Sequence, residues 1–495
     1  MYAEKFDNAY FSADIKQSER LIKECEEYLQ THKSDYRIAP LHYHIATTYS
    51  DLQKFDSSYN NDTTVEKVLY HYRKAIDLIH TPELDVSDYE PWVKGFKLQL
   101  YTNYGVALGK CDRKLAAIKC YRDAMEINPN FAMSCGNMGI GLLRYSYLLH
   151  DNGHKNFLNH FAYSYLRIAA NDKSESIEPA AKELFKRTID GLDKKYVEEF
   201  LEKDLEIPNY SLGRKSEQKF RLWCLKNHLF LNPLNDLPLE HSCFAADTLQ
   251  LPPIITSIEE REIPIFFGMF NQIKEDYIYS RYLLYQFLTQ KSLHFADKDT
   301  NLLNLYDYPQ YSIRVENGKT AFKTLYALLD KISYFANTYW ELGIKPRDVT
   351  FNSIWEEETK GKHKYQHKSL NYLENEALNS VRWIYKEFNE KFGDASNPMA
   401  KELKTLRHAL EHRYVKVHAS LFQPKNKEYP YIDKENTYHI SEEILGTYIL
   451  RLIRIIRELI IDLTMAVHIE EKKKRDPEYR IGKMVLFEYD DKWKV

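Results

Sequence analysis

Small and aromatic residues recur in the first half of the chain at a spacing of 34 residues, and this period constrains the fold more than any other feature. Gly105 and Leu108 have counterparts in Gly139 and Leu142. A period of this length is typical of helical hairpins that stack side by side, because one hairpin cannot bury its apolar face alone. The sequence therefore predicts an extended helical array and excludes a single small module.

Within one period, the pattern resembles the tetratricopeptide repeat (TPR). The matching positions are Tyr101, Tyr104, Gly105, Leu108, Ala117, Tyr121, Ala124 and Pro129. Degenerate copies, interrupted by insertions, cover residues 46–75 and 139–169. The resemblance implies that residues 1–200 form a TPR-like α-solenoid whose concave face binds a protein or peptide partner. A generic α-solenoid without a ligand is the alternative.

The composition is that of a folded globular protein, with 495 residues, 44% hydrophobic and 28% charged. The longest apolar run, residues 449–461, is interrupted by arginine and glutamate, so we expect no transmembrane segment and no membrane partner. The N-terminal residues do not resemble a secretion signal. Six cysteines without a C-x-x-C pair indicate neither a disulfide framework nor a zinc site. We therefore expect a cytoplasmic protein.

The second half of the chain predicts a helical bundle, so the expected fold class is all-α. Residues 201–300 contain several prolines and are interpreted as a mixed connector, followed by the bundle in residues 301–495. Apolar residues at three- and four-residue steps predict helices over 320–342, 370–388, 398–417 and 442–469. The last is the most apolar, so we expect it at the centre of the bundle.

The third predicted bundle helix carries two histidines on the side opposite its apolar stripe. At about 100° per residue, His408 and His412 point away from Leu410, and Arg407 borders their face. Histidine can take a proton from a ribose 2′-hydroxyl or give one to a leaving 5′-oxygen, and arginine can stabilise the charge on a pentacoordinate phosphorane. These three residues are the catalytic candidates. The alternative is a solvated helix face on which Arg407 pairs with Glu411.

Arg407 and His412, in the pattern Arg-x-x-x-x-His, resemble the signature of the HEPN superfamily, many members of which are metal-independent endoribonucleases. Segments 223–237, 325–340 and 406–414 are similar to the bacterial branch, in which this domain follows a tetratricopeptide-like region. The resemblance implies a homodimer or another even-numbered oligomer, in which Arg407 and His412 of two subunits line one cleft and cleave RNA in toxin or antiviral-defence systems. The family often has asparagine where this chain has His408, so His408 either orients the pair or takes part in the reaction.

The Arg-x-x-x-x-His pattern alone is not specific, because it occurs three times in the chain. The first copy, ending at His42, lies in the repeat region. The third, ending at His418, reaches the border of the apolar stripe of its predicted helix. Only the middle copy lies on the polar face, so we select Arg407 and His412.

Basic residues at three places are candidates for binding the phosphates of RNA, although each place is also explained by a solvated surface. Lys404 and Arg413 flank the catalytic candidates. The other candidates are Lys362, Lys364 and Lys368 in a loop and Lys472 and Lys473 in a C-terminal cluster. His363 and His367 lack a carboxylate or cysteine to complete a metal site.

Two functions remain open from the sequence. In the first, the protein is a metal-independent endoribonuclease that needs no cofactor. In this case Asp330, in the first predicted bundle helix, either orients His412 or is a solvated charge. In the second, it is a non-catalytic TPR-type interaction scaffold with a dimerising helical bundle.

Overall fold

The computed structural model describes most of the chain, in which α-helices predominate. The described residues are 2–32, 36–79, 91–173, 177–256, 263–303, 307–355, 369–393, 398–419, 436–475, 482, 484 and 486–494. Within these residues there is a single sheet, which has two strands.

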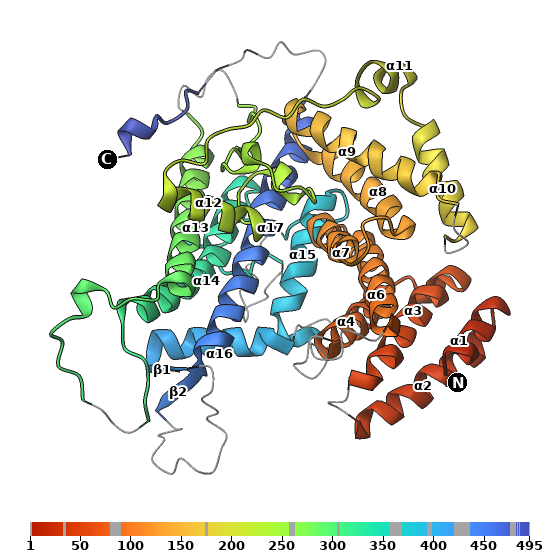
Figure 1. The fold of residues 1–495 in the computed structure, drawn as a ribbon, viewed down its shortest axis with the longest axis horizontal. Coiled ribbons are helices and arrows are strands. Elements are labelled where there is room, and N and C mark those ends of the chain that lie inside the picture. The colour runs from red at the N-terminus through yellow and green to blue at the C-terminus, as the bar shows by residue number, and fades with distance from the viewer. Residues whose placement is uncertain are drawn as a thin grey trace.

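The N-terminal region is a curved row of antiparallel helices along one side of the molecule (Figure 1). Its helices are α1 (Tyr2–Phe11), α2 (Ile15–Thr31), α3 (Ala39–Phe55), α4 (Asp62–Ile79), α6 (Pro91–Lys110), α7 (Lys114–Ile127), α8 (Ala132–Leu148), α9 (Asn152–Ala170) and α10 (Pro179–Asp190). The helices pack as hairpins, α3 with α4, α6 with α7 and α8 with α9. This arrangement agrees with the predicted stacking of hairpins.

The glycines that define the 34-residue period lie where two helices approach each other closely. A Cβ atom on Gly105 of α6 would lie 2.5 Å from the ring of Tyr121 in α7. A Cβ atom on Gly139 of α8 would lie 2.6 Å from Leu166 in α9. Both distances are shorter than a van der Waals contact, so only glycine lets these helix pairs approach this closely.

The connector contains short helices and extended chain that pack on the rest of the molecule. Its elements include α11 (Lys194–Tyr196), a π-helical turn (Val197–Leu201), α12 (Lys215–Lys226) and the 3-10 turn η4 (Pro233–Asp236). Residues 251–256 form neither a helix nor a strand. The long helix α13 (Phe266–Thr289) packs against the bundle rather than standing apart from it.

The bundle is built around one helix that is buried along most of its length. Its other helices are α14 (Ile313–Tyr339), α15 (Glu376–Phe388) and α16 (Pro398–His412), and the central helix is α17 (Glu442–Lys473). Helix α17 contacts α13, α14 and α15 and also α8 of the N-terminal region, which confirms the predicted central position. None of the described helices, α17 included, combines the length and the apolar character that a membrane span needs.

The structure corrects the predicted ends of three bundle helices. The helix expected over 320–342 begins earlier, after the N-cap Ser312, whose side chain accepts a hydrogen bond from Val315 N–H. The helix expected over 370–388 begins later, after the N-cap Asn375. The helix expected over 398–417 stops at His412.

Beyond His412 the chain forms a strand, so the fold is mostly helical rather than all-α. Strand β1 (Tyr414–His418) pairs in parallel with β2 (Thr437–Ser441), with Val417 opposite Ile440. Valine and tyrosine favour an extended chain, and their pairing with β2 outweighs the helical spacing read from the sequence.

Buried ion pairs join the N-terminal helices to the bundle. Arg113, at the start of α7, donates to Glu458 of α17 at 2.7 and 2.9 Å and to Glu387 of α15 at 2.7 Å. Arg73 of α4 also donates to Glu387, at 2.6 Å. Burial alone would raise the pKa of Glu387, but the two arginines hold it below its ordinary value. The bundle thus covers part of the inner side of the helical row.

Candidate active site

Helix α16 presents the catalytic candidates because its two sides differ in character. Ala400, Leu403, Leu406 and Ala409 are buried. His408 and His412 lie on the opposite side and are exposed, with 61% of the His412 side chain accessible. Their positions on the polar face are as predicted from the helical spacing.

Arg407 lies between an aromatic ring and a carboxylate. Its Nε donates to Glu411 Oε1 at 3.2 Å, one turn further along the helix. Its guanidinium carbon lies 5.0 Å from the centre of the Tyr326 ring of α14, a cation–π contact that holds the side chain against the bundle. With 40% of the side chain exposed, the guanidinium can still reach a ligand at the surface.

Glu411 connects Arg407 to His412. The second carboxylate oxygen of Glu411 lies 3.7 Å from His412 Nε2. Arg407 and His412 are five residues apart, about 140° around the helix, and the Glu411 carboxylate spans this separation. The rings of His408 and His412 lie 5.0 Å apart. One surface therefore holds two imidazoles and a guanidinium beside a shared carboxylate.

Asp330 lies near Arg407 rather than near His412. Its carboxylate accepts a hydrogen bond from Phe351 N–H at 3.2 Å. Burial raises the pKa of Asp330, while this hydrogen bond and the charge of Arg407 lower it. Among the described hydrogen bonds and ion pairs, none joins Asp330 to His412, so a direct orienting contact is not seen within one chain.

The two predicted RNA-binding residues on α16 and just after it lie beside the catalytic candidates. Lys404 is one turn before His408, is 68% exposed and lies 3.5 Å from Glu390. Arg413 directly follows the helix and is exposed. Lys404 thus adds positive charge one turn from His408.

The predicted basic residues of the C-terminal cluster are not part of this surface in one chain. Lys472 and Lys473 lie at the far end of α17, whereas Tyr448 near its start contacts α16 by donating to Glu402. The intervening 24 residues of helix correspond to roughly 36 Å. Lys472 lies 5.2 Å from the Tyr147 ring. Lys362, Lys364 and Lys368, and also His363 and His367, lie outside the described residues.

The two rival Arg-x-x-x-x-His patterns end at buried histidines. His418 lies in β1 rather than on a helix. Its ring stacks on the ring of His439, and His418 Nε2 lies 2.9 Å from His439 Nδ1. Burial and the neighbouring His439 lower the pKa of His418 to about 4. Burial likewise lowers the pKa of His42, which contacts His71, to about 3. Neither histidine is placed to meet a substrate, which supports the choice of Arg407 and His412.

Sequence reasoning did not identify Tyr326 as part of this site, and it considered Glu411 only as a surface partner. Tyr326 precedes Asp330 by four residues, which places both on one side of α14. The spacing of Tyr326 and Asp330 can be read from the sequence, but the packing of α14 against α16 cannot. Among the described residues, no group of three or more histidine, cysteine and carboxylate side chains is arranged to hold a metal ion.

A comparison with protein families identifies the domain that carries this site. Residues 257–470 match the family described as LA2681-like HEPN, so the chain contains a HEPN-family domain. The match covers α13 to α17 and leaves out the N-terminal helices, whose tetratricopeptide-like character stays a prediction. No curated protein and no solved structure matches the chain.

Proposed function

We propose that this protein is a metal-independent endoribonuclease whose active site forms when two bundles pair. The observation that carries the proposal is the exposed group of Arg407, His408 and His412 on α16, within the HEPN-family domain. Such a domain is consistent with RNA cleavage or nucleotide binding, and the two imidazoles with a guanidinium favour cleavage.

The proposed reaction is a transesterification within the RNA chain. His412 accepts the proton of a ribose 2′-hydroxyl as the 2′-oxygen bonds to the adjacent phosphorus. The bond from phosphorus to the 5′-oxygen breaks, and this oxygen takes a proton from a second histidine that starts the step protonated, either His408 or His412 of the other subunit. Arg407 donates hydrogen bonds to the phosphorane oxygens, where negative charge increases. The products are a 2′,3′-cyclic phosphate and a 5′-hydroxyl.

The solvent exposure of this group supports a paired site. A single α16 leaves His412 open to water, whereas catalysis by proton transfer and charge stabilisation is stronger where water is excluded. A second bundle placed against α16 by two-fold symmetry would enclose the group and bring two copies of Arg407 and His412 together. We therefore propose a homodimer, or a larger assembly built from such dimers.

The N-terminal helices are proposed to sense a partner. The bundle covers the parts of the row around Arg73 and Arg113, so a protein or peptide partner would bind the remaining concave surface. We place such an enzyme among toxin or antiviral-defence effectors in the cytoplasm, where the six free cysteines would stay reduced.

The test is RNA cleavage by the full chain in EDTA, with matched variants. We expect cleavage of total RNA to be lost in His412→Ala and Arg407→Ala. It should persist in His32→Ala, an exposed histidine just after α2, and in Arg187→Ala, which breaks an exposed pair of the same i,i+4 spacing. Light scattering should report an even number of subunits. Intact RNA with every protein, or cleavage that survives both active-site substitutions, would overturn the proposal and favour the non-catalytic scaffold.

A further inference from the structure

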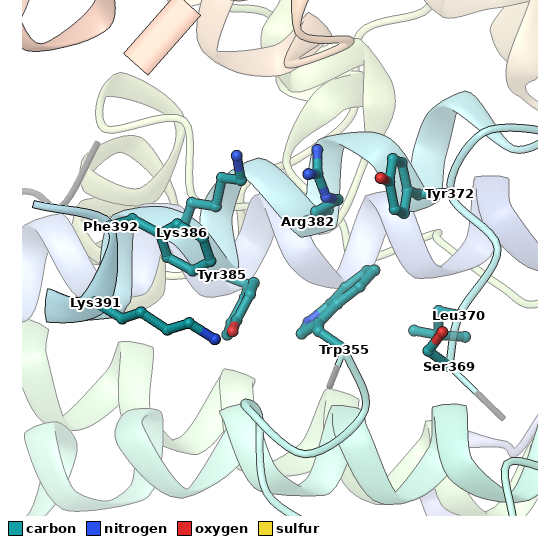
Figure 2. A pocket seen from close by; sticks show the side chains of 9 residues that line it. All are labelled: Trp355, Ser369, Leu370, Tyr372, Arg382, Tyr385, Lys386, Lys391 and Phe392. Carbon is teal, nitrogen blue, oxygen red and sulfur yellow. The ribbon is translucent and has the colours of Figure 1, made fainter. Parts of the chain in front are cut away.

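A cavity of about 230 Å³ near the candidate active site is lined mainly by aromatic and basic side chains. Its lining residues are Trp355, Ser369, Leu370, Tyr372, Arg382, Tyr385, Lys386, Lys391 and Phe392. Figure 2 shows Trp355 and Tyr385 side by side, with Lys391 extending toward Tyr385. The cavity thus combines flat aromatic rings with an exposed ammonium group at its edge.

The aromatic wall offers a stacking surface. The rings of Trp355 and Tyr385 are nearly parallel, with an interplanar angle of 22° and centres 5.9 Å apart. Nucleobases are flat rings that stack on aromatic side chains of this kind.

The cations of the cavity are not equivalent. Arg382 and Lys386 turn away from the Trp355 ring toward the N-terminal helices (Figure 2), where both bind Asp62. These two side chains therefore hold the wall in place. Lys391 lines the same cavity and is exposed, so a phosphate can reach it from solvent.

Two connections place the cavity next to the catalytic candidates. Glu390, the neighbour of Lys391 in the 3-10 turn η8 (Glu390–Phe392), lies 3.5 Å from Lys404, one turn before His408. On the other side, Phe351 binds Asp330 through its N–H, and its ring centre lies 6.3 Å from that of Tyr385. Neighbours of the cavity lining therefore contact Lys404 and Asp330, which places the cavity close to the catalytic candidates.

We propose that this cavity holds one unpaired nucleotide of the RNA substrate, with its base against Trp355 and Tyr385 and its phosphate toward Lys391 and Lys404. The choice of RNA rests on the proposed function. The volume is below the roughly 300–1,000 Å³ of sites for drug-sized ligands, which suits one base rather than several. A base in a duplex is stacked and paired, so the enzyme selects single-stranded RNA.

Binding of a labelled RNA oligonucleotide tests this subsite apart from catalysis. Anisotropy is measured with the full chain carrying His412→Ala, so that the RNA stays intact. Adding Trp355→Leu should weaken single-stranded RNA binding roughly 5- to 100-fold, the range for loss of one base–aromatic stack. Lys391→Ala should weaken it less and reduce its salt dependence. Trp355→Phe keeps a ring and should retain most of the affinity.

Matched controls and ligands make the outcomes distinct. Trp493→Leu and Lys195→Ala alter exposed residues elsewhere and should leave the affinity unchanged. The affinity for a duplex of the same sequence should not depend on Trp355. Unchanged single-stranded binding in Trp355→Leu would overturn the proposal, and so would binding of free adenosine monophosphate that depends on Trp355 while RNA binding does not.

Failure of this inference is separable from failure of the proposed function. If the wild-type chain cleaves RNA through His412 and Trp355→Leu changes neither binding nor cleavage, the subsite is overturned and the enzyme stands. If RNA binding depends on Trp355 but the wild-type chain cleaves nothing, the subsite stands as a binding site and the proposed reaction is overturned.

Discussion

The Nε of Arg407 lies 3.2 Å from a carboxylate oxygen of Glu411, and this carboxylate is the group that an RNA phosphate would have to replace. Both side chains are 40% exposed, so their attraction is weakened by water and is worth about 0–1 kcal/mol. A phosphate can form a two-pronged set of hydrogen bonds with the guanidinium. The pair is therefore weak enough for a phosphate to displace Glu411 from Arg407.

Glu411→Gln should strengthen RNA binding, because it removes the competing negative charge beside Arg407. We expect the dissociation constant for RNA to fall roughly twofold, in keeping with an exposed pair of about 0.5 kcal/mol, with little change in stability. Anisotropy with a labelled oligonucleotide measures the effect. Glu183→Gln, which breaks the exposed Arg187 pair of the same spacing, is the control. A large drop in cleavage at unchanged affinity would instead show that Glu411 positions His412.

Removing Arg113 should destabilise the whole chain. Glu458 and Glu387 would lose a buried partner at the junction between the N-terminal helices and the bundle. Loss of one partner of a buried ion pair costs about 3–5 kcal/mol, because the remaining charge stays out of water. Arg113→Leu should lower the free energy of unfolding in urea by this amount, and Arg187→Leu by less than about 0.5 kcal/mol. If both variants lower the free energy of unfolding by the same small amount, the ion pairs at this junction do not stabilise the fold.

The sequence predicted features that depend on one helix at a time. The burial of α17 and the exposure of His408 and His412 follow from the spacing of apolar residues along their own helices. Strand β1 was missed because its partner β2 begins 23 residues after β1 does, at Thr437, and local spacing does not show such pairing.

The contacts that complete the candidate site join separate elements and could not be read from local patterns. Tyr326 meets Arg407 only because α14 packs against α16. The rings of Trp355 and Tyr385 come together from a loop and from α15. Such contacts depend on how the helices of the bundle pack. The sequence predicted that a helical bundle forms, but not which helices pack against each other.

Acid should destabilise the sheet through His418. Its pKa is lowered to about 4 in the folded chain, first by burial and then by His439, against about 6.5 when unfolded. Between these values the unfolded chain binds the proton more readily, so stability falls as the pH decreases. When the pH is lowered from 7 to 5.5, this histidine should reduce the free energy of unfolding by on the order of 1 kcal/mol. His418→Asn should reduce the pH dependence of the unfolding free energy by this amount; an unchanged slope would contradict the lowered pKa.

The close approach of α6 and α7 can be tested with two glycines of one helix. Gly105→Ala would place a methyl group 2.5 Å from a ring carbon of Tyr121, and this ring is buried. We expect a loss of about 1–3 kcal/mol of stability, the usual cost of overpacking. A Cβ on Gly95 has no neighbour within 4 Å, so Gly95→Ala should stabilise α6 by about 0.5–1 kcal/mol. Adding Tyr121→Leu should recover part of the loss in Gly105→Ala, because the smaller side chain leaves room for the methyl group. If both alanine variants stabilise the protein in urea unfolding, the glycine at position 105 is not required for the helices to pack.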